Sequence, residues 1–383
     1  MDLTRFDTAA FLRDTWQQRP LLIRNPWDRW EPPLDPDELA GLACEDTVEA
    51  RMLVQDDGGV QAEDGPFPAA RFGTPEKRPW TLLVQAVDQH VPEVAALLES
   101  FRFIPNWRID DVMVSYASDG GGVGAHFDQY DVFLIQGQGR RRWQLGARCD
   151  EGTPLLPNDN VRLIADFQPT EDWILEPGDI LYVPPRFAHN GIALSDDCMT
   201  YSIGFRAPAR ADLLSAWCDD RLAEMDDDDR YEDPGLTLQD NPGEISSAAI
   251  DRLHALVTER LGDRAAFARW FGGYNSTPKY PEMDWQPEIP VGLEDVRACI
   301  GEGTPLIRNQ ASRFSFIRQD GGAVLLFVDG ECFEAADAAA LFAEQLCAHD
   351  RFVVDRGLIA SDAAGDLIAT LCNLGSIAFE AAD

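Results

Sequence analysis

The sequence contains very little lysine, and its charge is strongly of one sign. Lys77 and Lys279 are the only lysines, and 32 basic residues stand against 67 acidic ones, which gives a formal net charge of −35. Such a surface repels the phosphates of nucleic acids and anionic membranes, and it attracts basic partners. We therefore expect a basic protein partner, with no direct nucleic-acid binding and no membrane association. The acidity also suits a salt-rich cytoplasm, in which carboxylates keep a protein hydrated, so this second explanation stays open.

Paired cysteines, long apolar runs and an N-terminal signal are missing as well. The eight cysteines are scattered without a CxxC pair, which argues against a zinc ribbon or a disulfide scaffold and favours reduced thiols. No apolar run approaches the roughly 20 residues that a membrane-spanning helix requires. The first seven residues contain no apolar signal region. These absences predict a soluble, cytoplasmic protein.

The 383 residues are enough for two or three domains. Residues 1–208 contain many short apolar runs separated by glycine and proline, which is typical of a β-sandwich or barrel. Residues 209–275 carry apolar residues at helical spacing on both sides of an acidic segment. Residues 276–383 combine short helices with short strands, as winged-helix domains do. The predicted fold class is mixed α+β, with a barrel, a helical region and a small winged-helix-like domain.

The helical region contains two apolar stripes. They consist of Leu213, Leu214, Trp217 and Leu222 in the first, and of Ile250, Leu253, Val257 and Leu261 in the second. Faces of this kind can close on the first domain or on a second copy of the chain, and we expect a homodimer. From Gln286 to the end, 16 acidic residues stand against 6 basic ones, so the last domain is not expected to bind DNA.

Histidine is scarce enough for each of the five to be considered singly. His90, His254 and His349 lie in surroundings typical of structural or surface residues. His126 differs, because it follows a glycine-rich segment and stands two residues before Asp128. On a β-strand, residues i and i+2 point to the same face, so the two side chains can bind one ion. With a distant histidine they would form the facial triad that holds non-haem Fe(II).

The distant histidine is predicted to be His189. It follows a turn at Pro177–Asp179, a short apolar strand at Ile180–Val183 and the pair Pro184-Pro185, which ends that strand. This order is the pattern by which a double-stranded β-helix returns a ligand to the mouth of its barrel. A decorated sandwich with a structural histidine is the alternative.

Three consecutive arginines follow a predicted hairpin. Gly137-Gln138 suits a two-residue type II′ turn, which would pair Leu134 with Arg141. Leu134 shares a face with His126 by the period of two, so Arg141 would point into the barrel and its two neighbouring arginines outward; a three-residue turn would reverse this choice. An inward guanidinium is costly unless an anion meets it. A bidentate carboxylate is the natural partner.

At these residues the sequence resembles the JmjC-type cupin oxygenases and, among them, the bacterial ribosomal oxygenases. The similar segments are residues 122–143, 177–185 with His189, 201–208 and, near the start, 11–24. The resemblance implies a double-stranded β-helix that uses Fe(II), 2-oxoglutarate as cosubstrate, and O2. It implies that His126, Asp128 and His189 are the catalytic metal ligands. It further implies that Arg141 and Ser115 bind the distal carboxylate of 2-oxoglutarate.

The resemblance also implies a substrate and an assembly. The substrate would be the ribosomal protein numbered sixteen of the large subunit, hydroxylated at C3 of an arginine side chain, and the central helices would form a dimer. The same iron site would serve histidine hydroxylation in another ribosomal protein or N-methyl lysine demethylation, so these activities remain alternatives. A non-catalytic metal-binding cupin is a third alternative, although it would not require an inward cation such as Arg141.

Overall fold

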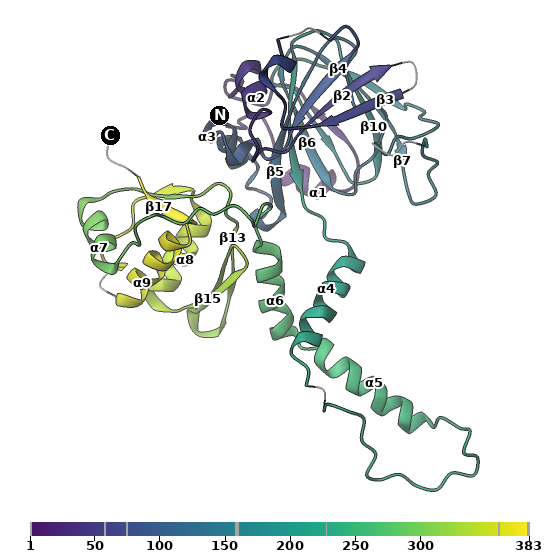
Figure 1. The fold of residues 1–383 in the computed structure, drawn as a ribbon, viewed down its shortest axis with the longest axis vertical. Helices are drawn as coiled ribbons and strands as arrows, with labels where there is room; N and C mark the ends of the chain where they lie inside the picture. Colours follow the sequence, from purple (N-terminus) through teal and green to yellow (C-terminus); the bar gives the residue numbers. More distant parts are fainter. Residues whose placement is uncertain are drawn as a thin grey trace. The chain divides into compact units, whose positions relative to one another are not determined.

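The computed structural model describes residues 2–56, 59–73, 76–157, 161–226, 228–358 and 361–380. Contacts within the chain divide it into two compact units, Met1–Ala207 and Pro208–Asp383. In Figure 1 the first unit is coloured from purple to teal and the second from teal through green to yellow.

The N-terminal unit begins with α1 (Thr8–Asp14). It also contains α2 (Pro36–Leu42) and the one-turn α3 (Pro92–Ala95). A capping box fixes the start of α2, because Asp35 accepts from the backbone N–H of Glu38 while the Glu38 carboxylate accepts from that of Asp35. Phe11, Leu39 and Val94 anchor the three helices in one large core.

Two antiparallel sheets form the body of this unit. The larger sheet has the order β1-β9-β6-β11-β5-β4-β2-β3. Its strands are β1 Leu21–Ile23, β2 Ala50–Asp56, β3 Gly59–Asp64, β4 Trp80–Val84, β5 Ile109–Ala117, β6 Asp131–Gln138, β9 Ile180–Val183 and β11 Cys198–Phe205. The smaller sheet has the order β10-β7-β8, with β7 Arg141–Arg148, β8 Glu171–Leu175 and β10 Phe187–Ala193.

The register of the larger sheet separates an outer face from an inner one. Tyr201 pairs with Val114 and Ile135, and this row lies in the core shared with the helices. The next row, Ser202 with Leu134, faces the other way, and Leu134 packs with side chains of the smaller sheet. Alternate residues therefore line an interior between the two sheets. The double-stranded β-helix predicted from the sequence is confirmed.

Two local predictions were wrong. β6 and β7 do not form a hairpin, because β6 pairs with β9 and β11 whereas β7 pairs with β10 and β8. The chain passes from one sheet to the other at Gly139, whose φ is 64°. His126 and Asp128 do not lie on a regular strand, since His126 forms only an isolated bridge with His189. Closing two sheets around an interior requires such crossings, and the local pattern of apolar residues does not reveal them.

The C-terminal unit begins with three helices and continues as an α+β domain. Its elements are α4 Arg210–Ala223, α5 Ser247–Leu261, α6 Arg264–Ser276, α7 Leu293–Glu302, α8 Asp337–Ala348 and α9 Asp362–Asn373, with strands β12 Leu306–Arg308, β13 Phe314–Arg318, β14 Val324–Val328, β15 Glu331–Ala335, β16 Arg351–Phe352 and β17 Ile377–Phe379. The strands form two three-stranded sheets, β16-β12-β17 and β13-β14-β15. None of the helices in the described ranges is long and apolar enough to cross a bilayer.

Candidate active site

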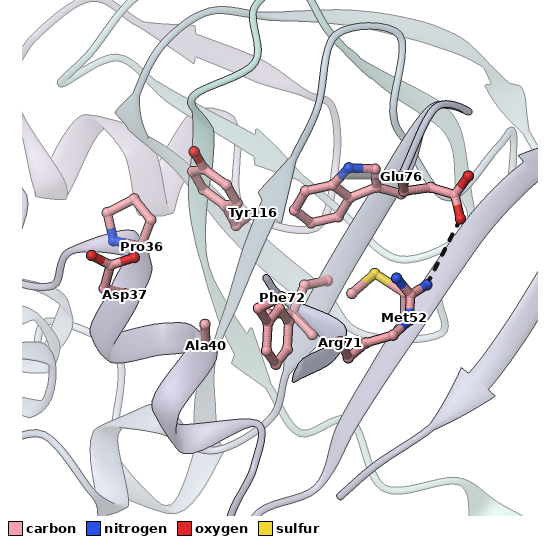
Figure 2. Close-up of a pocket in the computed structure, with 10 residues that line it drawn as sticks. Pro36, Asp37, Ala40, Met52, Arg71, Phe72, Glu76 and Tyr116 are labelled. Carbon is pink, nitrogen blue, oxygen red and sulfur yellow. Dashed lines mark ion pairs between the residues drawn. The ribbon is translucent and has the colours of Figure 1, made fainter. Parts of the chain in front are cut away.

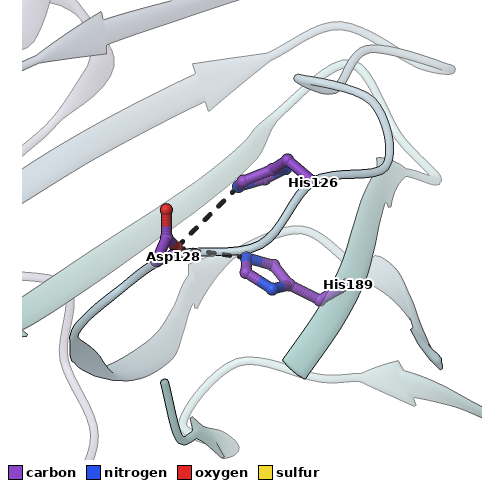
Figure 3. Close-up of side chains that lie close together, drawn as sticks. All are labelled: His126, Asp128 and His189. Atoms are coloured by element: carbon purple, nitrogen blue, oxygen red, sulfur yellow. Dashed lines mark ion pairs between the residues drawn. The ribbon is translucent and has the colours of Figure 1, made fainter. Parts of the chain in front are cut away.

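His126, Asp128 and His189 lie together at the start of β10 (Figure 3). Two backbone hydrogen bonds join the segments that carry them: His126 N–H donates to His189 O at 3.0 Å, and His189 N–H donates to His126 O at 2.8 Å. Nε2 of His189 is 3.5 Å and Nε2 of His126 is 4.0 Å from Oδ2 of Asp128. The three residues predicted as metal ligands are therefore brought together, although by a bridge between two segments rather than by one strand.

The histidine rings present the nitrogen that a metal would use. Nδ1 of His126 lies 2.8 Å from the carbonyl oxygen of Gly124, and Nδ1 of His189 lies 2.9 Å from that of Phe187. A carbonyl can only accept, so each Nδ1 carries the proton and each Nε2 turns its lone pair toward Asp128. Burial, reinforced by His126, lowers the pKa of His189 to about 4. His189 is therefore neutral at pH 7, the form in which imidazole binds a metal.

This donor set fits a divalent transition metal. Two imidazole nitrogens and one carboxylate converge within 4.8 Å of one another. Three acceptors that meet without a donor between them favour a cation at the centre. Two histidines with one carboxylate, and further coordination positions left open, are the ligand set of non-haem Fe(II) oxygenases. Within the residues that the structure describes, this is the one group of three or more histidine, cysteine or acidic side chains arranged to hold a metal.

Arg141 lies inside the barrel, as predicted, although the hairpin argument for it was wrong. Its side chain is 3 % exposed, while Arg142 is exposed and forms an ion pair with Asp172. Its Nε donates to Cys198 Sγ at 3.5 Å, and its Nη2 has no hydrogen-bond partner. A buried guanidinium without an anion is costly. An incoming carboxylate that accepts two hydrogen bonds would satisfy it.

Ser115 lies on the same inner face of the barrel. It is 3 % exposed on β5 and pairs with Thr200 on β11 and Leu83 on β4. Its neighbour Tyr116 points to the outer face, toward the core shared with the helices. The structure therefore places Ser115 in the interior that contains Arg141, and its contact with a carboxylate stays a prediction.

Tyr130 is a further residue of the site that the sequence reasoning missed. It is 44 % exposed, and the carboxylate of Asp128 is close enough to act on its hydroxyl electrostatically. Burial of the hydroxyl, together with the negative charges of Asp128, Asp111 and Asp110, raises the pKa of Tyr130. The signal was present, because Tyr130 follows Asp128 by two residues, as Asp128 follows His126.

A separate cavity of about 180 Å³ lies on the opposite, outer face of the larger sheet (Figure 2). Its lining includes Trp80 and Leu82 on β4 and Tyr116 on β5, which alternate with the inward-facing Thr81 and Ser115. None of the predicted metal ligands or cosubstrate residues lines it. The outer cavity is therefore distinct from the candidate active site.

The chain matches two family models. Residues 96–213 match the JmjC domain, and residues 259–378 match the ROXA-like winged helix. The first match includes all three predicted metal ligands, Arg141 and Ser115. The second extends from the end of α5 to β17.

Individual proteins are similar over most of the chain. The ribosomal protein uL16 3-hydroxylase of Escherichia coli is 36 % identical over 331 residues, which are 86 % of this chain and 86 % of that protein. A crystal structure of E. coli ycfD has a TM-score of 0.90 at 33 % identity and covers 99 % of this chain and 100 % of that one. The E. coli ribosomal oxygenase YcfD in complex with cobalt and 2-oxoglutarate has a TM-score of 0.87 at 34 % identity, with 99 % of both chains covered. On this evidence the chain belongs to the bacterial ribosomal oxygenase family of JmjC proteins.

Proposed function

We propose that this protein is an Fe(II)- and 2-oxoglutarate-dependent oxygenase that hydroxylates C3 of an arginine side chain in ribosomal protein uL16. The observation that carries the proposal is the pairing of two features in one barrel interior: a converging His-Asp-His set, and a buried guanidinium whose Nη2 has no hydrogen-bond partner. A bound metal accounts for the first feature. A dicarboxylic keto acid that reaches both the metal and Arg141 accounts for the two features together. The E. coli relatives support the substrate and the cosubstrate, since one is a uL16 3-hydroxylase and another is in complex with 2-oxoglutarate.

Each residue has a defined task in this proposal. His126, Asp128 and His189 hold the iron, which when bound supplies the power to oxidise an unactivated C–H bond with O2. Arg141 and Ser115 bind the distal carboxylate and so fix the reach of the cosubstrate from the iron. The overall reaction converts 2-oxoglutarate and O2 into succinate and CO2 and places one oxygen atom in the substrate C–H bond. Arg141 and Ser115, each 3 % exposed, would hold the distal carboxylate away from bulk water.

The acidic surface suits a basic substrate. A net charge of −35 attracts an arginine-bearing ribosomal protein and repels RNA phosphates. The winged-helix region shares the acidic excess, so we propose that it contacts protein rather than nucleic acid. The enzyme would then meet uL16 in the cytoplasm, where ribosomal proteins are made.

We further propose that the region 209–275, between domains at 1–208 and 276–383, joins two copies of the chain into a homodimer. Trp217 of α4 packs against Phe267 and Trp270 of α6, with ring centroids 5.4 and 5.3 Å apart. α5 differs, because none of its residues is buried and its apolar stripe at Ile250 and Val257 is more than half exposed. An exposed apolar stripe of this kind marks an interaction surface.

The direct test is a reaction of the purified, Fe(II)-loaded protein with 2-oxoglutarate and recombinant uL16. We expect uL16 to gain the mass of one oxygen atom on an arginine, with equimolar succinate, and His126→Ala to produce neither. Turnover of 2-oxoglutarate without a mass change in uL16 would keep the oxygenase and remove the substrate assignment. No turnover with any ribosomal protein would remove both. Intact-mass comparison of ribosomes from cells with and without the gene extends the test to the cell.

A further inference from the structure

Two buried donors on the inner face of β7 have no hydrogen-bond partner. They are Nη2 of Arg141 and the indole Nε1 of Trp143, in side chains 3 % and 4 % exposed. Residues two apart on a strand share a face, so both donors serve one interior. Native proteins satisfy the great majority of buried polar groups, because an unsatisfied buried donor is unfavourable. Two such donors side by side therefore indicate an acceptor that enters the barrel.

The register of the smaller sheet gives Trp143 a definite place. Three rows succeed one another along β10 and β7: His189 with Leu145, Gly191 with Trp143, and Ala193 with Arg141. Each row is about 7 Å from the next. Trp143 thus lies one row from the metal ligand and one row from the carboxylate-binding arginine. A cosubstrate that reaches from the metal to Arg141 must pass the indole.

Contacts on both sides confirm this intermediate place and fix the ring. The Trp143 ring centroid is 5.9 Å from that of His189 and 5.7 Å from Cζ of Arg141. A Cβ atom on Gly191 would lie 2.7 to 2.9 Å from three atoms of the indole. The six-membered ring therefore rests directly on the backbone of Gly191, and a side chain there would displace it. The indole is held in one orientation before any ligand binds.

The surroundings of Arg141 indicate that one ligand group accepts hydrogen bonds from both Arg141 and Trp143. Its Nε is already directed to Cys198, and Cys198 clusters with Ala117 and Ala193. These small side chains leave the guanidinium without a protein anion. We propose that the indole N–H of Trp143 donates a hydrogen bond to the distal carboxylate of 2-oxoglutarate, beside the bonds from Arg141. This inference rests on the proposed function, because it takes 2-oxoglutarate as the ligand.

Calorimetric titration of 2-oxoglutarate into protein loaded with Zn(II), which is redox-inactive, tests the proposal without turnover. Trp143→Phe keeps an aromatic ring and removes the N–H donor, and we expect it to weaken binding roughly ten- to hundredfold. Trp173→Phe is the matched control, since Trp173 pairs with Trp143 across β7 and β8, and it should bind as the wild type does. Binding by Trp143→Phe within twofold of the wild type would overturn the inference.

The indole proton gives a second readout, which is measured on the wild-type protein. In protein labelled with 15N-tryptophan, the cross-peak that Trp143→Phe removes should move downfield when 2-oxoglutarate is added. An unmoved cross-peak at saturating 2-oxoglutarate would overturn the inference and leave the proposed function standing. Failure of the wild-type protein to bind 2-oxoglutarate at all would instead defeat the proposed function.

Combining Trp143→Phe with Arg141→Lys tests which end of the cosubstrate is involved. Two donors to one carboxylate are energetically coupled, so the combined loss in affinity should differ clearly from the product of the two separate losses. Independent losses would place the indole bond away from the distal carboxylate and overturn the assignment.

Discussion

The two units of the chain differ in which side chains lie in unfavourable surroundings: buried polar groups in the first, and exposed apolar groups in the second. In the N-terminal unit, Arg141, Trp143 and Thr81 are buried and each has a polar atom without a hydrogen-bond partner. In the C-terminal unit, Val257 and Ile289 are apolar yet 59 % and 80 % exposed. Both situations are unfavourable for an isolated chain. The first fits the small polar ligand proposed for the barrel interior, and the second fits a surface that a macromolecular partner would cover.

The two units also differ in what fixes the position of these side chains. The barrel residues are fixed by strand register, and a change of one residue would turn Arg141 and Trp143 out of the interior. α5 has no such frame, and an isolated helix of its length is marginal in water. The proposed ligand binding in the first unit therefore depends on the exact position of a few side chains. The proposed interaction of the second unit depends on the area of its exposed apolar surface. Substitutions that affect one unit and spare the other sharpen this comparison.

The largest effect is expected from His126→Ala. Removing one of three metal ligands should reduce 2-oxoglutarate turnover to background, measured as succinate release, and should lower the iron content of the purified protein. The side chain belongs to none of the apolar core clusters and is 23 % exposed, so the thermal unfolding temperature and the oligomeric state should not change. Retained turnover would remove the metal assignment.

Arg141→Met separates function from stability within the N-terminal unit. We expect the affinity for 2-oxoglutarate to fall on the order of a hundredfold or more, because a buried charge pair with the ligand is lost. We also expect the ligand-free protein to gain about 1–3 kcal/mol, because an unpaired buried charge is replaced by an apolar side chain.

Arg142→Met is the matched control for that variant. Its guanidinium is exposed and pairs with Asp172, so its loss should cost less than about 1 kcal/mol and leave binding unchanged. A ligand-free Arg141→Met protein less stable than the wild type would show that the guanidinium is satisfied without a ligand.

The corresponding change in the C-terminal unit is charge on the apolar stripe of α5. Ile250→Asp, Leu253→Asp and Val257→Asp together should convert a dimer into a monomer, measured by size exclusion with light scattering. Turnover of 2-oxoglutarate per chain should persist, since the iron and cosubstrate residues belong to the other unit. Arg252→Asp on the opposite face of α5 is the control. An unchanged molar mass would mean that this stripe does not join two copies.

The metal ligands could be predicted from the sequence because residue type alone carries most of that signal. With five histidines in the chain, the spacing of His126 and Asp128 and the context of His189 left few alternatives. The sequence argument placed Arg141 inward on the basis of an incorrect hairpin. The inward direction was nevertheless correct, because alternate residues of β7 face the interior and Arg141 is one of them.

Trp143 shows what the sequence could not give. A tryptophan between arginine and glutamine on a short strand is most often a core residue, and in packing terms Trp143 is one. Its role depends on an absent partner for Nε1 and on the contact with Gly191, 48 residues along the chain. Both are properties of the closed barrel. The crossing from β6 to β7 escaped prediction for the same reason, since only the pairing of distant strands decides it.

The most local expected effect is a pH dependence confined to the N-terminal unit. The pKa of His189 is about 4 in the folded protein, against about 6.5 in an unfolded chain. Between these values the unfolded state binds more protons than the folded state, so stability is complete above pH 6.5 and falls as the pH is lowered toward 4. The loss amounts to at most about 3 kcal/mol. Hydrogen exchange of β7 and β10 peptides in metal-free protein, measured from pH 7 to 4.5, should show it.

His189→Gln is the comparison that isolates this effect, because it removes the titrating group and keeps a polar side chain. Its protection in β7 and β10 should fall less steeply with pH than that of the wild type, once the intrinsic exchange rate is corrected. Protection in α8 and α9 should follow one pH profile in both proteins, since His189 belongs to the other unit. Equal slopes in β10 would mean that the pKa of His189 in the folded protein is close to its unfolded value, so that burial does not lower it.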